Sequence, residues 1–101
     1  MTTDAIGTTV TDEAVSSLAG TADPRLRELL SGLIRHLHAF ARETRLTQAE
    51  WEQAIGFLTA TGQKCTDTRQ EFILLSDVLG LSMLVETING DRAPGATEST
   101  V

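Results

Sequence analysis

The residues of this sequence that could take part in chemistry are two histidines, one cysteine and an aspartate within an apolar run. They are His36, His38, Cys65 and Asp77. Histidine and aspartate can bind a metal ion, and a cysteine beside a base can act as a nucleophile. His36 and His38 lie two residues apart in a segment with helical periodicity, so their side chains point about 200° apart. They cannot bind one metal ion from a single helix, and we expect them to flank an apolar stripe.

Cys65 and Asp77 have no sequence neighbours that indicate a reactive site. Cys65 is the single cysteine, so it cannot form an internal disulfide, and we expect a reduced, unreactive thiol. Asp77 lies among leucines, where an unpaired carboxylate would be costly to bury. It either faces solvent or an arginine, or it lines a pocket formed with a second domain or chain. Without zinc spacing or a glycine-rich phosphate loop, the sequence by itself predicts no catalytic residue and no metal ligand.

The composition of the chain limits the classes of partner. With 101 residues it is expected to form one domain, and its formal net charge is −6 with a pI of about 4.7. A nucleic-acid-binding surface needs clustered positive charge, which argues against DNA or RNA as a partner. The N-terminus lacks the pattern of a secretory signal, and no run reaches the roughly twenty apolar residues that span a bilayer. We therefore expect a cytoplasmic protein without a membrane span.

The elements that would position these residues are helices. A short helix is expected over about 12–19, with Thr11 as its N-cap and Gly20 at its end. Residues 24–44 are typical of an amphipathic helix, because Asp23–Pro24 supplies an N-cap followed by a proline suited to the first helical position. The apolar residues of this second helix recur three and four positions apart and are Leu26, Leu29, Leu30, Leu33, Leu37 and Phe40.

The third expected helix has the strongest local signal, a capping box at residues 47–50. The Thr47 hydroxyl can accept a hydrogen bond from the amide of Glu50, and the Glu50 side chain can reach back to the amide of Thr47. Gly62 is expected to end this helix in a left-handed conformation.

A fourth helix is expected to begin after Asp67, which has Gln70 three residues on, and to run to about Asn89, where Asn89–Gly90 would stop it. Its segment 71–88, EFILLSDVLGLSMLVETI, would carry apolar groups on nearly every side. Gly80 lies inside it, at a cost of about 1 kcal/mol relative to alanine, so the helix is either continuous or broken there. Exposed apolar surface of this extent usually marks an interface or a ligand groove. We therefore predict an all-α fold, a small bundle of about four helices that completes its core with a partner.

Two stretches carry a resemblance to a known family. They are LTQAEWEQAIGFLTATGQ at 46–63 and RQEFILLSDVLGLSMLVETIN at 69–89. Over about residues 23–101 the chain resembles the N-terminal helical dimerisation domain of the intradiol ring-cleaving dioxygenases, which include the catechol, chlorocatechol and hydroxyquinol 1,2-dioxygenases. The run SGLIRHLHAFARE at 31–43 is most similar to the hydroxyquinol type.

The resemblance implies partners and a pocket for this chain. In this family the N-terminal helices form the homodimer interface, where a phospholipid-like or fatty-acid amphipath occupies an apolar tunnel. The helix that matches LLSDVLG also lines the substrate pocket of the neighbouring catalytic domain. Carried over to this sequence, the pocket-wall residues are Leu74, Asp77 and Val78. Val78 would lie where side-chain bulk affects which ring substituents fit.

The resemblance also places the family's iron outside this chain. The family holds Fe(III) with two tyrosines and two histidines, whereas this sequence has no tyrosine and its histidines do not match the ligand positions. We expect no cofactor in this chain and no activity from it alone. The expected organisation is a flexible arm at 1–10, a helical dimerisation domain at 11–90 and a linker at 91–101 toward a catalytic domain absent from this chain.

The predicted function is that of a dimerisation and pocket-wall domain in a dioxygenase that cleaves catechol or hydroxyquinol with O2. Two other readings of the residues stay open. The chain could be a stand-alone helical homodimer that binds an amphipathic lipid without catalysis, which predicts a dimer carrying an acyl chain. A helical DNA-binding module is disfavoured by the acidic charge.

Overall fold

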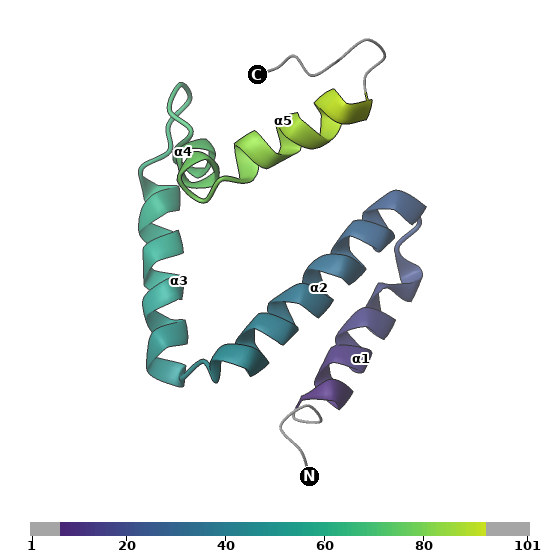
Figure 1. Ribbon diagram of the computed structural model, residues 1–101. Coiled ribbons are helices and arrows are strands. Elements are labelled where there is room, and N and C mark those ends of the chain that lie inside the picture. Colours follow the sequence, from purple (N-terminus) through teal and green to yellow (C-terminus); the bar gives the residue numbers. More distant parts are fainter. Residues whose placement is uncertain (1–6, 93–101) are drawn as a thin grey trace. The chain divides into compact units, whose positions relative to one another are not determined.

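The computed structural model describes residues 7–92, and every regular element in that range is helical (Figure 1). The helices in chain order are α1 (Thr8–Ser16), the short 3-10 helix η2 (Ser17–Gly20), α2 (Pro24–Thr44), α3 (Gln48–Gln63), α4 (Glu71–Val78) and α5 (Leu81–Arg92). The chain divides into two compact units, residues 1–51 and 52–101. The predicted all-α class is confirmed. Residues 1–6 of the expected arm and 93–101 of the expected linker lie outside the described range.

In the first unit, α1 lies beside α2 and runs in the opposite direction (Figure 1). The predicted bounds of this first helix were wrong, because it begins at Thr8 rather than near residue 12. Gly7 is the N-cap, with a left-handed φ of 78°, and residues 17–20 tighten into η2. Thr11 does not cap the helix. It lies within α1, where its hydroxyl donates to the carbonyl of Gly7 at 3.1 Å and its side chain is buried against α2.

The predicted start of α2 is confirmed. The Asp23 carboxylate accepts from the amides of Arg25 at 2.9 Å and Leu26 at 3.2 Å, and Pro24 is the first helical residue. The helix ends at Thr44, and Arg45 follows with a left-handed φ of 55°. A positive φ at a residue with a Cβ is uncommon, and glycine is the usual choice at such a helix end.

The capping box of α3 is confirmed in both directions. The Thr47 hydroxyl accepts from the Glu50 amide at 3.1 Å, and the Glu50 carboxylate accepts from the Thr47 amide at 3.0 Å. The expected stop at Gly62 was wrong, because α3 continues to Gln63 and Gly62 does not have a positive φ. A Cβ at Gly62 would lie 3.7 Å from Cζ of Phe72. This glycine therefore leaves room for the Phe72 ring rather than reversing the chain.

The apolar run of the second unit forms two helices rather than one. Gly80 has a φ of 81° and separates α4 from α5, which settles the choice that the sequence left open. The helix begins after Asp67 as expected, at Glu71, and its N-cap is Gln70, whose side chain accepts from the Phe72 amide. The predicted stop at Asn89–Gly90 was wrong. The Asn89 side chain donates to the carbonyl of Val85 at 2.7 Å, and α5 continues past it.

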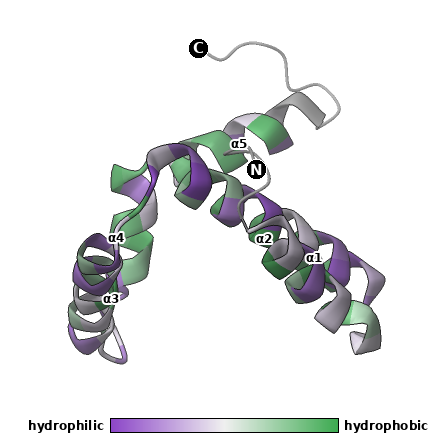
Figure 2. Ribbon diagram, turned by 90° about the horizontal axis from the view of Figure 1, so that it is seen from below, coloured by the Kyte–Doolittle hydropathy of each residue, from purple (hydrophilic) through white to green (hydrophobic). Residues whose placement is uncertain are grey.

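Within residues 7–92 no hydrophobic side chain is fully buried, and Thr11, at 6% exposure, is the one buried residue. The half-buried residues of α2 include a set at helical spacing, namely Arg27, Leu30, Ile34, His38 and Ala41, and also Ser31, Gly32, Ala39 and Arg42. The neighbouring apolar stripe stays exposed and comprises Leu26, Leu29, Leu33, Leu37 and Phe40. Figure 2 likewise shows hydrophobic residues along α4 and α5, where most large apolar side chains are exposed. The described part of each unit therefore has no enclosed hydrophobic core.

Gly80→Ala is expected to lower the free energy of unfolding by about 1–2 kcal/mol, because a left-handed backbone forces a Cβ against the following carbonyl oxygen. Space is not the cause, since a Cβ at Gly80 would have no neighbour within 4 Å. Chemical denaturation of the full-length gene product measures this change.

Gly56→Ala is the matched control for that variant. Gly56 lies inside α3, and a Cβ there also has no neighbour within 4 Å. The same substitution should stabilise the protein by up to about 1 kcal/mol at this position, because alanine is the better helix former. Equal effects of the two substitutions would contradict a special role for the φ of Gly80.

Candidate functional site

The predicted pocket-wall residues lie on one outward side of α4. Leu74, Asp77 and Val78 are three and four positions apart, so they project from the helix within an arc of about 100°. All three are exposed, Leu74 at 53% and Val78 at 75%. The Val78 side chain is the last of α4 before the chain turns. The helix therefore presents two apolar groups and one carboxylate together.

The start of α4 is held by a short hydrogen-bonded turn. The Thr66 hydroxyl accepts from the amide of Arg69 at 3.0 Å, and the carbonyls and amides of these two residues bond each other. The Arg69 guanidinium then donates to Glu71 in the first turn of α4 at 2.7 Å. That hydrogen bond and the Glu71 charge raise the pKa of Arg69 above its ordinary value. Together with the Phe72 ring over Gly62, these contacts fix where α4 begins.

The end of α4 is held by contacts across the break. The amide of Gly80 donates to the carbonyl of Asp77 at 3.1 Å, which closes the last turn. The hydroxyls of Ser76 and Ser82 lie 2.8 Å apart and join α4 to α5. The polar pair Ser76–Asp77 therefore has two separate roles. Ser76 connects the two helices, while the Asp77 side chain is exposed and takes no part in that contact.

The Asp77 carboxylate is available to a ligand. It is exposed, and it has no hydrogen bond or ion pair with another side chain among residues 7–92. An ionised carboxylate offers only acceptor oxygens, and its hydrogen bonds to hydroxyl donors are stronger than neutral ones. Flanked by Leu74 and Val78, it could accept from a hydroxyl on a flat apolar ring.

The two histidines do not come together as a site. His38 is half-buried against α1, whereas His36 is exposed. Within the described part of the chain, no three His, Cys, Asp or Glu side chains are grouped so as to hold a metal ion. Cys65 is half-buried, and its thiol lies 3.6 Å from the carbonyl of Thr61 and 3.5 Å from the Gln70 side chain. No described base lies beside the thiol to activate it.

A polar cluster between α1 and α2 is a feature that sequence reasoning missed. Its centre is the buried Thr11 hydroxyl, which accepts from Nη1 of Arg42 at 3.0 Å and lies 2.6 Å from Nδ1 of His38. The single hydrogen of this hydroxyl can go either to the Gly7 carbonyl or to Nδ1 of His38, and the tautomer of His38 decides which. The partners lie 27 and 31 residues from Thr11 in sequence. No local pattern could have indicated this cluster.

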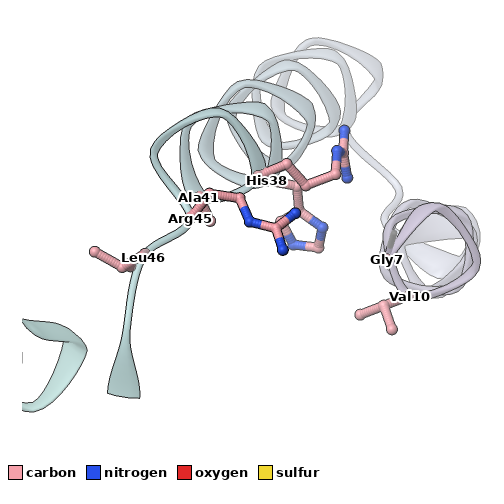
Figure 3. A pocket seen from close by; sticks show the side chains of 7 residues that line it. Gly7, Val10, His38, Ala41, Arg45 and Leu46 are labelled. Carbon is pink, nitrogen blue, oxygen red and sulfur yellow. The ribbon is translucent and has the colours of Figure 1, made fainter. Parts of the chain in front are cut away.

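A hollow of about 510 Å³ opens next to this cluster (Figure 3). Its lining residues are Gly7, Val10, His38, Ala41, Arg42, Arg45 and Leu46. In Figure 3, His38 lies between Leu46, in the turn after α2, and Val10 from α1. The lining combines two guanidinium groups and an imidazole with three small apolar side chains. A second hollow nearby, of about 490 Å³, includes Leu46 and Trp51, the two residues that flank the capping box of α3.

Comparisons with known proteins agree with the resemblance predicted from the sequence. Residues 23–97 match the family model described as the catechol dioxygenase N terminus. The chain is 56% identical over 92 residues to a 6-chlorohydroxyquinol 1,2-dioxygenase of Cupriavidus pinatubonensis, which covers 91% of this chain and 33% of that protein. It is 55% identical over 97 residues to a hydroxyquinol 1,2-dioxygenase of Rhodococcus opacus, covering 96% of this chain and 32% of the relative.

A solved structure agrees with these relatives in sequence and in fold. The crystal structure of a hydroxyquinol 1,2-dioxygenase from Pseudomonas putida matches with a TM-score of 0.85 and 50% identity, over 97% of this chain and 35% of that one. The chain thus spans about a third of the length of the relatives it matches. Because the family model covers most of the sequence, including α2 to α5, the chain belongs to the family of catechol dioxygenase N-terminal domains.

Proposed function

We propose that this chain is the dimerisation and pocket-wall part of an intradiol dioxygenase that cleaves hydroxyquinol-type rings with O2. The observation that carries the proposal is the outward side of α4, where Leu74, Asp77 and Val78 lie exposed together. An apolar wall with one acceptor suits a flat ring that carries hydroxyl groups. The named activities of the relatives, hydroxyquinol and 6-chlorohydroxyquinol 1,2-dioxygenase, support this ring class.

In this proposal α4 orients the substrate and takes no part in bond breaking. Leu74 and Val78 would exclude water from one face of the ring and limit the size of its substituents. Asp77 would accept a hydrogen bond from a ring hydroxyl and so set the rotation of the ring within the pocket. The break at Gly80 and the Ser76–Ser82 contact would keep these side chains in place.

The family's Fe(III) does not fit the residues of this chain. Fe(III) coordination in the family uses two tyrosines, and this sequence has none. The histidines are also unsuited, because His38 binds Thr11 while His36 is exposed on the same helix. The iron would therefore be held by residues of the catalytic domain, which we propose as the partner of α4.

The exposed stripe of α2 supports the proposed homodimer. Leu26, Leu29, Leu33, Leu37 and Phe40 form this stripe, and each is about half exposed in the isolated chain. Burying such a side chain fully stabilises a protein by about 1.5–3 kcal/mol. Burial of this stripe against a second copy would therefore be favourable. A lipid between the two copies stays a prediction, and native mass spectrometry of the purified protein would detect it.

Val78→Ala and Val78→Leu test the pocket wall by changing its bulk in opposite directions. In the full-length gene product, Val78→Ala is expected to raise kcat/KM for 6-chlorohydroxyquinol relative to hydroxyquinol, and Val78→Leu to lower it. Each change should be about 10-fold or more, because one methylene in an apolar pocket contributes about 1–3 kcal/mol of discrimination, or about 10- to 200-fold. Steady-state kinetics with both substrates measures this ratio, and iron analysis should show unchanged metal content.

Leu79→Ala is the matched control for the wall. Leu79 is as exposed as Val78 but projects about 100° away from it around the helix. Its substitution should leave the substrate ratio within about twofold of wild type. A ratio that stays constant in both Val78 variants, with full iron content, would exclude Val78 from the pocket.

A further inference from the structure

The hollow between α1 and the end of α2 is positively charged, which is unusual for this acidic chain. The protein is acidic overall, yet Arg42 and Arg45 both line the hollow, and no carboxylate does among the described residues. Neither arginine has an ion pair with a described acid, whereas Arg25 and Arg69 each have one. We propose that this hollow binds a small oxyanion, a carboxylate or phosphate, carried on a short apolar body.

The backbone of Arg45 supports a binding role. Its φ of 55° is left-handed, and Arg45 is the one residue other than glycine with a positive φ between 7 and 92. A side chain in this conformation costs on the order of 1 kcal/mol relative to glycine, and strain of this kind concentrates at ligand-binding positions. Stability alone would favour glycine here. Binding of an anion in the hollow would account for an arginine at this position.

Arg42 is held in place before any ligand binds. Its guanidinium crosses from α2 to α1, where Nη1 donates to the Thr11 hydroxyl, and it lies about 4 Å from the position of a Cβ at Gly7. That geometry differs from an arginine that merely neutralises the carbonyls at the end of its own helix. The remaining donors of the guanidinium have no described partner, so they are free for an oxyanion.

The lining also defines the class of ligand. Guanidinium groups match the planar, bidentate geometry of carboxylates and phosphates. Val10, Ala41 and Leu46 add an apolar part next to them, which suits an aromatic or short aliphatic body. The positive first turn of α1 and the negative last turn of α2 both border the hollow and oppose each other. The two arginines therefore determine that the hollow prefers a negatively charged ligand.

The test uses three soluble probes with the full-length gene product, labelled at the methyl groups of valine and leucine. Benzoate carries the charge and the apolar body, inorganic phosphate only the charge, and benzyl alcohol only the body. Benzoate is expected to shift the Val10 and Leu46 methyl resonances in a saturable way. Phosphate should bind more weakly, and benzyl alcohol should not saturate at the same concentrations.

Arg45→Gly and Arg42→Gln should each raise the dissociation constant for benzoate at the Val10 and Leu46 methyl groups by about tenfold or more, since each removes a charged hydrogen-bond donor. Arg45→Gly is the sharper variant, because glycine prefers the left-handed backbone and should keep or raise the melting temperature. Arg35→Gln is the control. This substitution removes the same charge from a residue that is exposed on α2 and lies outside the hollow.

Three results would overturn the proposal. The first is the absence of saturable benzoate shifts at Val10 and Leu46. The second is equal binding of benzyl alcohol and benzoate there, which would indicate an apolar hollow without a preference for charge. The third is an unchanged dissociation constant in both Arg45→Gly and Arg42→Gln. The site does not depend on the proposed ring cleavage, because its readout is local to α1 and α2 and requires no turnover.

Discussion

Asp77→Leu in the full-length gene product is expected to lower kcat/KM for hydroxyquinol by about 100-fold, and to change that for catechol by less than about threefold. Hydroxyquinol carries a third ring hydroxyl, and a site that accepts a hydrogen bond from a substrate hydroxyl loses the most when its acceptor is removed. Asp77→Asn keeps an acceptor without the charge and should lower the hydroxyquinol value about tenfold. Steady-state kinetics with the two substrates measures this selectivity.

The structural basis of this expectation is the environment of Asp77. Its carboxylate is exposed on α4 and unpaired within the described residues, so its replacement should break no internal contact. Stability and iron content should therefore stay at their wild-type values. Glu86→Gln, at an exposed acid on α5, controls for the lost charge. An equal loss of activity toward both substrates in Asp77→Leu would show that the carboxylate does not recognise the third hydroxyl.

Leu33→Glu is expected to convert a dimer of the full-length gene product into monomers. Leu33 lies in the middle of the exposed stripe of α2 and is 53% exposed in the isolated chain. In a two-fold interface each copy contributes this residue, so both side chains are lost together. At about 2 kcal/mol for each apolar side chain, the dimer dissociation constant should rise by about a thousandfold before the cost of burying the new charges. Analytical ultracentrifugation over a concentration series measures it.

Arg35→Glu is the control for dimer dissociation. Arg35 is exposed on the same helix, about 200° around the helix from Leu33, so a glutamate there should leave the association unchanged. Leu33→Ala should give an intermediate dissociation constant. A dimer that persists in Leu33→Glu with unchanged affinity would place the interface elsewhere, and a monomeric wild type would exclude the proposed homodimer.

Hydrogen bonds that close within one helical turn were predictable from the sequence. The Asp23 cap and the Thr47–Glu50 box each join residues no more than three positions apart, so residue types alone specify them. The glycines were less predictable, because the same residue serves different purposes. Gly80 is left-handed and separates α4 from α5, whereas Gly62 stays helical and leaves room for the Phe72 ring. Only the position of the ring distinguishes the two.

Some candidate site residues were likewise predictable from the sequence, whereas others were not. Leu74, Asp77 and Val78 were named from the sequence through a family resemblance, and the helical period places them on one side of α4. The cluster of Thr11, His38 and Arg42 had no signal in the sequence, because its members meet through the packing of α1 on α2. The left-handed Arg45 was equally hidden, since residue preferences at that position favour glycine.

The sequence by itself determined that this protein is helical, where α2 and α3 begin, and that it has more apolar surface than a small domain can bury. These properties follow from periodicity, capping and composition, which act over a few residues or add along the chain. The tertiary structure decided which apolar face α1 covers, where the long apolar run breaks, and that two arginines without an ion pair to a described acid share a hollow. Such features depend on contacts between residues distant in sequence, and no local sequence pattern specifies which of these residues meet.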